Sequence, residues 1–451
     1  MNEIGRKILC IILCLLLIVP VCGQGAEGAL RSGNKGSRVV QLQKRLKEVK
    51  LYTGDTDGIY GSKTEKAVQR AQEQLSLAGY EVEITGVADE NTLTLIYDEN
   101  CTSALLTLRR GSSGTRVKEL QSRLIELNLL NAKADGDFGE KTEQAVLTFQ
   151  QRMAELGVEG LGMDGAASPE LVEILQSDLS VYGFHCPLYY DESHPEALAE
   201  DDLYAPSVIL IDGPSGEVLF EKNAHTRMYP ASTTKVMTLL LAVEGGDLDR
   251  LVTVPDSAGD VPSDSSLVPV YPGEEMTLRD LLYGLMIRSG NDAANAVAEL
   301  CGGSVEEFVA QMNQRAQELG LEDTHFTNPH GYQDEDHYTT ASDLAVITRL
   351  GLTDPDFCQI VTCLQYTLPA TSKRKELTIR STHEIFDPES EYYIPYAAGV
   401  KSGTTKAAGF CYIGAWQKGE QTLIAVIMGS SGKTYAWKDL KKLFAYGEAT
   451  R

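Results

Sequence analysis

Two stretches in the N-terminal third of the chain share one spacing of apolar side chains. The apolar positions are Val39, Leu42, Leu46 and Val49 in the first stretch and Val117, Leu120, Leu124 and Leu127 in the second. Intervals of three and four residues place such side chains on one face of an α-helix. Each stretch is therefore predicted to form an amphipathic helix within a small helical domain.

The two stretches belong to an internal repeat with an offset of 78 residues. Asp57–Gly61 aligns with Asp135–Gly139, and both segments read Asp-Gly-x-aromatic-Gly. The glycines allow positive φ, so each segment is predicted to form a turn, with Thr64 or Thr142 near the start of the next helix. We predict two all-α domains, at residues 30–98 and 108–175.

These copies resemble the peptidoglycan-binding repeat that is often attached to cell-wall hydrolases. The resemblance implies three short helices around the Asp-Gly-x-aromatic-Gly turn in each copy, and peptidoglycan as the partner. A spacer function without a ligand is the alternative, because a fold does not by itself establish a ligand. We favour wall binding.

The apolar patterns that are typical of β-strands occur in the C-terminal part of the chain, after a segment that shows no regular spacing of apolar residues. Residues 177–205 contain prolines and acidic residues and are predicted to form a linker. Short apolar runs then occur in pairs, at 207–211 with 217–221 and at 410–416 with 423–428, and each pair predicts a hairpin. A further domain is therefore expected at residues 206–447.

The N-terminus has the pattern of an export signal. Arg6 and Lys7 precede an unbroken apolar run from Ile8 to Val19, which is too short to cross a membrane comfortably. We predict a signal peptide at residues 1–26 and a secreted, wall-associated protein without a membrane anchor after cleavage. An uncleaved segment that tethers the chain is the alternative.

Charge narrows the choice of partners. The chain has 64 acidic and 40 basic side chains, which gives a formal charge of -24. Such a charge repels nucleic-acid phosphates, so no nucleic-acid partner is expected. Six cysteines remain after the signal segment, and we expect them to be mostly buried small hydrophobic residues.

A candidate nucleophile lies where a helix is predicted to begin. Pro230 cannot extend a helix backwards, so the helix is expected to start near Ser232. Lys235 is three residues further on, on the same face, where its amine can reach the Ser232 hydroxyl. A serine attacks well only when a neighbouring base takes its proton, and a lysine serves as that base only when its pKa is depressed.

Two further motifs follow in order. Ser289-Gly290-Asn291 lies between apolar helical stretches, and Lys401-Ser402-Gly403 precedes the C-terminal strand pair. Ser-x-x-Lys, Ser-x-Asn and Lys-Ser/Thr-Gly in this order are typical of penicillin-binding proteins and class A β-lactamases. Together with Asn328-Pro329-His330-Gly331, they make residues 205–447 similar to the low-molecular-mass penicillin-binding proteins that are serine D-Ala-D-Ala carboxypeptidases.

This resemblance implies an α/β (α+β) domain in which a mainly antiparallel sheet is flanked by helices, and it implies no cofactor and no metal. It also implies hydrolysis of the terminal D-Ala from stem peptides and covalent inhibition by β-lactams. The implied catalytic residues are Ser232 as nucleophile, Lys235 as base, and Ser289, Asn291 and Lys401. The implied substrate-binding residues are Ser402, Gly403 and Thr404, and the backbone N–H groups of Ser232 and Thr404 are the implied oxyanion hole.

Three alternatives stay open. A class A-like β-lactamase needs a Glu followed four residues later by Asn, and we find no such pair between Asn291 and His330. A zinc site would use His325, His330 and His337, whose spacing fits no single helical face. A wall-binding or β-lactam-sensing protein without turnover would not need the complete set of motif hydroxyls and amines that the chain retains.

Overall fold

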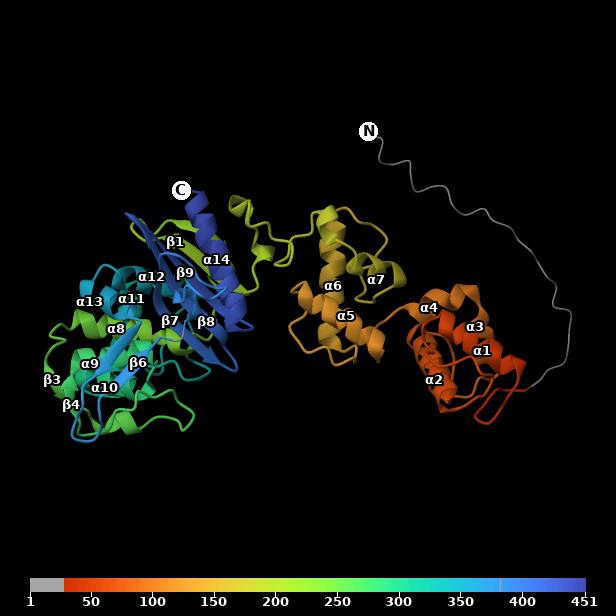
Figure 1. Ribbon diagram of the computed structural model, residues 1–451, viewed down its shortest axis with the longest axis horizontal. Coiled ribbons are helices and arrows are strands. Elements are labelled where there is room, and N and C mark those ends of the chain that lie inside the picture. Colours follow the sequence, from red (N-terminus) through yellow and green to blue (C-terminus); the bar gives the residue numbers. More distant parts are fainter. Residues whose placement is uncertain (1–27, 382) are drawn as a thin grey trace. The chain divides into compact units, whose positions relative to one another are not determined.

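The computed structural model describes residues 28–381 and 383–451 (Figure 1). The predicted signal peptide lies outside the described residues. The described chain forms two compact units, one with residues 28–118, 136–147 and 161–174 and the other with residues 119–135, 148–160 and 175–451. The boundary between the units passes through the second predicted repeat.

The first repeat contains three helices, α1 (Ser37–Glu48), α2 (Ser62–Leu77) and α3 (Glu90–Tyr97). The apolar stripe of α1 is buried with the apolar side chains of α2. The turn before α2 is held by the Tyr60 hydroxyl, which donates to the carbonyl of Gly86 at 2.7 Å. Gly58 has φ of 73°, and a Cβ there would lie 2.8 Å from Val40 Cγ2, which explains the glycine.

The second repeat has the same succession, α5 (Thr115–Glu126), α6 (Glu140–Glu155) and α7 (Pro169–Gln176). A short helix, α4 (Thr102–Leu106), precedes it. An isolated β-bridge pairs Leu108 with Ala167, and an equivalent bridge pairs Leu30 with Ala88 in the first copy. The equivalent bridges and helices confirm the helical N-terminal region that the sequence predicts.

The C-terminal unit is built on a five-stranded sheet. The strands are β1 (Ser207–Asp212), β2 (Val218–Lys222), β7 (Ala397–Thr405), β8 (Gly409–Lys418) and β9 (Gln421–Ser430). Their order is β2-β1-β9-β8-β7, and every neighbouring pair is antiparallel. Both predicted hairpins are present. The Lys401–Gly403 motif, which is the third motif along the chain, lies on β7 at the edge of the sheet.

Helices cover both faces of this sheet (Figure 1). One face packs against α14 (Lys433–Ala449), and the other packs against α12 (Ala341–Gly351) and α8 (Lys235–Glu244). Side chains alternate between the faces, so Tyr412 of β8 belongs to the α14 cluster and Ile413 to the α8 cluster. The predicted α/β class with a mainly antiparallel sheet is confirmed.

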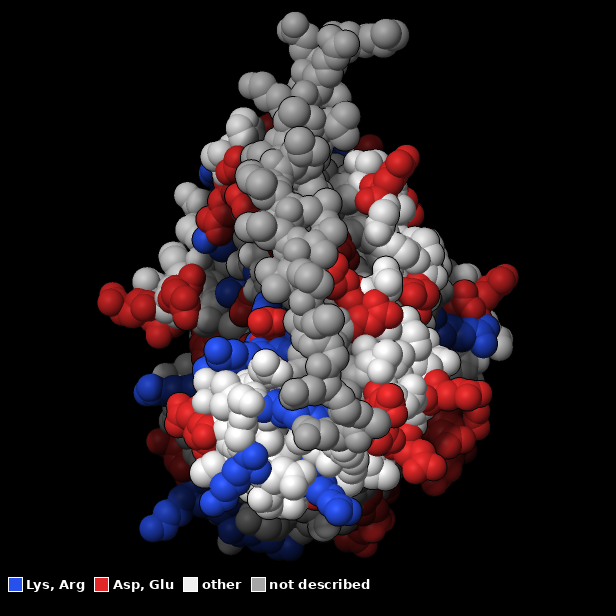
Figure 2. Space-filling model, turned by 90° about the vertical axis from the view of Figure 1, so that its right-hand side faces the viewer, with Lys and Arg blue, Asp and Glu red and all other residues white. Residues whose placement is uncertain are grey.

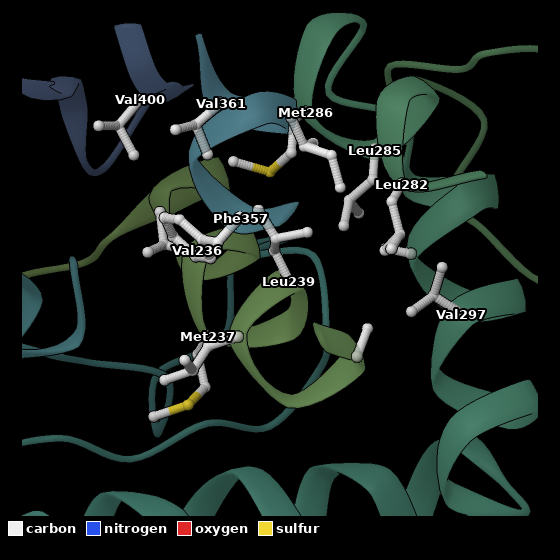
Figure 3. Packing of buried hydrophobic residues seen from close by; sticks show 14 of the residues in the cluster. Val236, Met237, Leu239, Leu282, Leu285, Met286, Val297, Phe357, Val361 and Val400 are labelled. Carbon is white, nitrogen blue, oxygen red and sulfur yellow. The ribbon is translucent and has the colours of Figure 1, made fainter. Parts of the chain in front are cut away.

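The helix α8 lies within a second layer of helices. Around it are α9 (Leu278–Ile287), α10 (Asn291–Gly302), α11 (Val305–Glu318) and α13 (Pro355–Val361). Figure 3 shows Val236 and Leu239 of α8 among side chains from α9, α10 and α13. Two small hairpins, β3 (Leu251–Thr253) with β4 (Glu275–Thr277) and β5 (Gln365–Leu368) with β6 (Leu377–Arg380), complete the domain. Burial on all sides fixes α8, and with it Lys235 at its first turn.

Residues 177–205, for which the sequence predicts a linker, end in contact with the C-terminal domain. Leu203 and Ala205 are buried in the α14 cluster. The Asp439 carboxylate of α14 accepts the backbone N–H groups of Tyr204 and Ala205 at 3.0 and 2.8 Å. Burial raises the pKa of Asp439 to about 6. The end of this segment is thus fastened to α14 by buried polar contacts.

Acidic and basic side chains lie interspersed on the face that Figure 2 shows. Between residues 28 and 451, leaving out 382, no helix combines the length and the apolar character needed to cross a membrane. The six cysteines in this part of the chain carry free thiols, and Cys101, Cys186 and Cys411 are buried.

Candidate active site

Ser232 lies on a tight turn that leads into α8. The sequence predicts that an α-helix starts near this residue, but residues 231–234 form a 3₁₀ turn, η6 (Ala231–Thr234), and α8 begins at Lys235. The turn is closed by the Thr233 and Thr234 hydroxyls, which donate to the carbonyls of Pro230 and Ala231 at 2.7 and 2.9 Å. These bonds compete with α-helical pairing and keep the first turn tighter.

The amine of Lys235 is the centre of the site. Its Nζ lies 3.0 Å from Ser232 Oγ and 2.8 Å from Asn291 Oδ1. The third neighbour is the backbone carbonyl oxygen of His330, also at 2.8 Å. Two of these neighbours can only accept a hydrogen bond, whereas the Ser232 hydroxyl can also donate one. A neutral amine with two N–H groups and one lone pair fits this set and directs its lone pair at the Ser232 proton.

The surroundings of Lys235 favour that neutral form. The side chain is fully buried, and burial holds its pKa well below the ordinary value for lysine. The Lys401 ammonium lowers the pKa further, while the Asp292 carboxylate acts in the opposite direction. Burial and a like charge are the two effects that convert a lysine into a base near neutral pH.

Asn291 is placed by the start of α10. Its side-chain amide donates to Ser265 Oγ at 3.0 Å, and its backbone N–H donates to the Ser266 carbonyl at 2.8 Å. The next residue, Asp292, accepts the backbone N–H groups of Val268 and Val270 at 3.0 Å each. Asp292 therefore anchors the loop that forms one wall of the site, a task that we did not assign to it from the sequence.

The Asn328–Gly331 segment contributes its backbone. Asn328 Oδ1 accepts the N–H of Gly331 at 2.7 Å, which shapes the turn. Gly331 has φ of 85°, and a Cβ there would lie 1.7 Å from the carbonyl oxygen of Ala231. Only glycine allows this approach, and it brings the His330 carbonyl to Lys235.

The imidazoles of this region bond to protein groups. His330 Nδ1 accepts the backbone N–H of Tyr332 at 3.1 Å, so this imidazole bonds within its own loop. His337 Nδ1 accepts the N–H of Thr327 at 3.0 Å, and its Nε2 lies 2.8 Å from the Thr234 hydroxyl. Burial lowers the pKa of His330 to about 3 and that of His337 to about 4. Among the described residues, no group of three metal-ligating side chains is found.

The third motif passes directly beside the nucleophile. A Cβ at Gly403 would lie 2.6 Å from the backbone nitrogen of Ser232, so β7 packs against η6 without a side chain between them. Lys401 is buried, and its amine donates to the carbonyl of Ser402 at 2.7 Å. Burial lowers the pKa of Lys401 to about 7.

Some of the predicted site residues line one cleft, whereas others do not make the contacts with one another that we expected. Ser232, Asn291 and Thr404 line a cleft of about 640 Å³, whose other walls come from residues 264–266, 331–333 and 405–407. Ser289 has φ of 59° before the start of α10, and within the described chain no hydrogen bond connects its hydroxyl to Lys401. Ser402 Oγ instead contacts His383 Nε2 at 3.0 Å. We did not single out His383 from the sequence, because no periodicity or motif surrounds it.

Comparison with known protein families agrees with this geometry. Residues 194–432 match the family described as D-alanyl-D-alanine carboxypeptidase. Residues 35–96 and 113–175 match a peptidoglycan binding domain. The first match overlaps the domain with the five-stranded sheet, and the second overlaps the two helical repeats.

Several curated proteins are similar to the C-terminal part. D-alanyl-D-alanine carboxypeptidase DacF of Bacillus subtilis is 37% identical over 230 residues, which are 50% of this chain and 58% of that protein. DacC of Escherichia coli is 32% identical over 55% of this chain and 64% of its own length. DacB2 of Mycobacterium tuberculosis is 36% identical over 54% of this chain and 82% of its own length. The chain thus spans less than two thirds of the first two relatives.

Solved structures show the same fold. The Streptomyces K15 DD-transpeptidase aligns with a TM-score of 0.52 and 29% identity, over 56% of this chain and all of that one. A D-alanyl-D-alanine carboxypeptidase from Mycobacterium tuberculosis aligns with a TM-score of 0.50 and 33% identity, over 54% of this chain and 91% of that one. The described site therefore lies in a fold that these two proteins share.

Proposed function

Because the chain belongs to the D-alanyl-D-alanine carboxypeptidase family, we propose that its C-terminal domain, at residues 206–447, removes the terminal D-Ala from peptidoglycan stem peptides. The observation that carries this proposal is the contact between Lys235 Nζ and Ser232 Oγ at 3.0 Å. The remaining two partners of the amine are carbonyl-type acceptors, so Ser232 is the one of its three partners that can give it a proton.

The reaction begins with proton transfer from Ser232 to Lys235. Ser232 Oγ attacks the carbonyl carbon of the penultimate D-Ala, and the backbone N–H groups of Ser232 and Thr404 stabilise the oxyanion. When the tetrahedral intermediate collapses, the C–N bond breaks and the leaving D-Ala amine takes a proton. This is the proton that Lys235 took from Ser232, and a relay from Lys235 through Ser289 and Lys401 is its proposed route, so that Lys235 is neutral again when D-Ala leaves. The peptide remains attached to Ser232 as an ester.

Water completes the cycle in the place that the D-Ala amine has left. Lys235 takes a proton from this water, which attacks the ester carbonyl, and the proton returns to Ser232. Asn291 is proposed to hold the peptide amide, and the Thr404 hydroxyl, with the charge of Lys401, is proposed to bind the terminal carboxylate. The Ser402 hydroxyl, which the sequence assigns to substrate binding, contacts His383 and is not among the residues that line the cleft. All of these residues belong to the matched region, and three of them line the cleft.

The direct test uses the purified protein and a pentapeptide ending in D-Ala-D-Ala. Release of free D-Ala is expected, and the Ser232→Ala variant should release none. A fluorescent penicillin should label Ser232 and remain bound. Labelling without release of D-Ala would indicate a sensing protein, rapid loss of hydrolysed penicillin would indicate a β-lactamase, and D-Ala release without labelling would overturn the serine mechanism.

The matched repeats support a proposal about location as well. We expect the protein to act outside the cytoplasm, with export through residues 1–26 and attachment to the wall through the repeats. Protein whose Ser232 has been blocked with penicillin should sediment with insoluble peptidoglycan, because the repeats stay free to bind. Blocked protein that remains in the supernatant would instead support the spacer alternative.

A further inference from the structure

His383 belongs to none of the three motifs, yet it contacts the third one. Its Nε2 lies 3.0 Å from Ser402 Oγ, and its Nδ1 lies 3.3 Å from the Tyr412 hydroxyl. A neutral imidazole donates through one nitrogen and accepts through the other, so a single neutral ring satisfies both contacts. The ring therefore bridges two side chains that come from different strands.

The strand register explains why the bridge forms. Ser402 of β7 pairs directly with Tyr412 of β8, so their side chains project from the same face of the sheet. This is the face that α14 covers, whereas Gly403 lies against η6. His383 fills the position between the paired side chains and the helix.

Aromatic rings fix the orientation of the imidazole. Tyr412 meets it edge to face with 5.1 Å between the ring centroids, and Trp437 of α14 and Phe386 lie at 5.9 Å each. The carboxylate of the adjacent Glu384 is occupied elsewhere, because it accepts from Trp437 Nε1 and from the Lys433 amine at 3.2 and 2.9 Å. Among these neighbours, His383 meets only uncharged partners.

We propose that His383 is a positioning residue for the third motif, which holds Ser402 in place and, through Ser402, the Lys401 amine beside Lys235. Ser402 is restrained at two atoms, since its hydroxyl contacts His383 and its carbonyl accepts from Lys401 at 2.7 Å. Loss of the first contact frees the hydroxyl to rotate and weakens the restraint on the second. This inference rests on the proposed acylation of Ser232.

The charges and the burial around His383 are consistent with a neutral imidazole. Burial, and next the Lys401 charge, lower the pKa of His383 to about 3. A cation at this position would repel Lys401, whereas the neutral ring supplies hydrogen bonds without adding charge. The buried phenol of Tyr412, whose pKa burial raises, also stays neutral. His383 and Tyr412 therefore both stay neutral over the pH range in which the site would work.

The test compares substitutions that differ in one property. His383→Phe keeps a planar ring but removes both ring nitrogens, whereas His383→Gln keeps an N–H donor that can reach Ser402 Oγ. We expect His383→Phe to slow acylation by fluorescent penicillin about tenfold, the order expected for one lost hydrogen bond to a group of the site. His383→Gln should stay within about threefold of the wild-type rate, since it retains that bond.

A double-substitution cycle separates positioning from a general loss of stability. Ser402→Ala removes the partner hydroxyl, so adding His383→Phe to it should cause little further loss of acylation rate. His225→Phe is the matched control, because His225 is an exposed histidine of the same domain. Thermal unfolding of each variant shows whether the fold is retained.

The outcomes separate the two proposals. Wild-type acylation in His383→Phe, a slow His383→Gln variant, or losses that multiply in the double variant would overturn the role of His383. Failure of the wild-type protein to release D-Ala would overturn the proposed function alone, since the relative acylation rates by penicillin could still be measured.

Discussion

The backbone nitrogen of Ser232 and the α-carbon of Gly403 are so close that a Cβ at position 403 would stand 2.6 Å from that nitrogen. The same Cβ would lie 2.9 Å from the nitrogen of Thr233. Both nitrogens belong to the turn that presents the nucleophile, so the glycine sets the distance between the turn and the edge strand.

Gly403→Ala is accordingly expected to displace either η6 or β7 and to slow acylation by fluorescent penicillin at least about 100-fold, as expected when reacting groups shift by about 1 Å. Gly259→Ala is the control, since a Cβ at Gly259 meets nothing within 4 Å. A Gly403→Ala protein that is acylated at the wild-type rate would show that β7 and η6 can move apart without loss of acylation activity.

The charge of Lys401 should control the pH dependence of acylation. Lys235 acts as a base only above its own lowered pKa, and Lys401 helps to lower that pKa only while it is charged, which is below about pH 7. Lys401→Gln removes the charge and should move the rising limb of the acylation rate to higher pH. If the acylation rate of Lys401→Gln rises at the same pH as that of the wild type, burial alone depresses the pKa of Lys235.

His337 should make folding stability depend on pH. Its pKa is about 4 in the fold and ordinarily 6.5, so the unfolded chain binds a proton that the folded chain excludes between these values. The free energy of unfolding should therefore fall as pH drops from 6.5 towards 4, by about 1.4 kcal/mol per pH unit from this residue.

Urea unfolding at several pH values can isolate that contribution. His337→Asn should show a shallower pH slope than the wild type in the same window, whereas the exposed His225→Asn should not. Equal slopes in His337→Asn and wild type would assign the pH dependence to other groups.

Gln72 should be important for the stability of the first repeat. Its buried amide accepts the N–H groups of Thr85 and Gly86 at 3.1 and 2.9 Å and donates to the Val87 carbonyl at 2.9 Å. Gln72→Ala leaves these backbone groups without their partner and should lower the free energy of unfolding of the repeat by about 2–4 kcal/mol.

A control on the same helix tests this expectation. Lys66 of α2 is exposed, so Lys66→Ala should change the stability by less than about 0.5 kcal/mol. Chemical unfolding followed by circular dichroism measures both variants. Equal stability of the Gln72→Ala and Lys66→Ala proteins would mean that water replaces the Gln72 amide.

The sequence by itself determined whatever depends on short separations along the chain. The three- and four-residue spacing of Val39, Leu42 and Leu46 specifies one face of α1, because helix geometry converts that spacing into a common direction. The same reasoning placed Lys235 within reach of Ser232, and it held although the turn between them is 3₁₀ and not α.

Only the tertiary structure decided which distant segments meet. Three hydrogen bonds join residues that are far apart in the chain: from Lys235 to the His330 carbonyl, from the Val268 N–H to Asp292, and between His383 and Ser402. Such bonds leave no periodic pattern in the sequence. These contacts depend on the order of the strands and on the close approach of two glycine-containing segments to η6. Packing of the whole domain, which no local spacing encodes, fixes both.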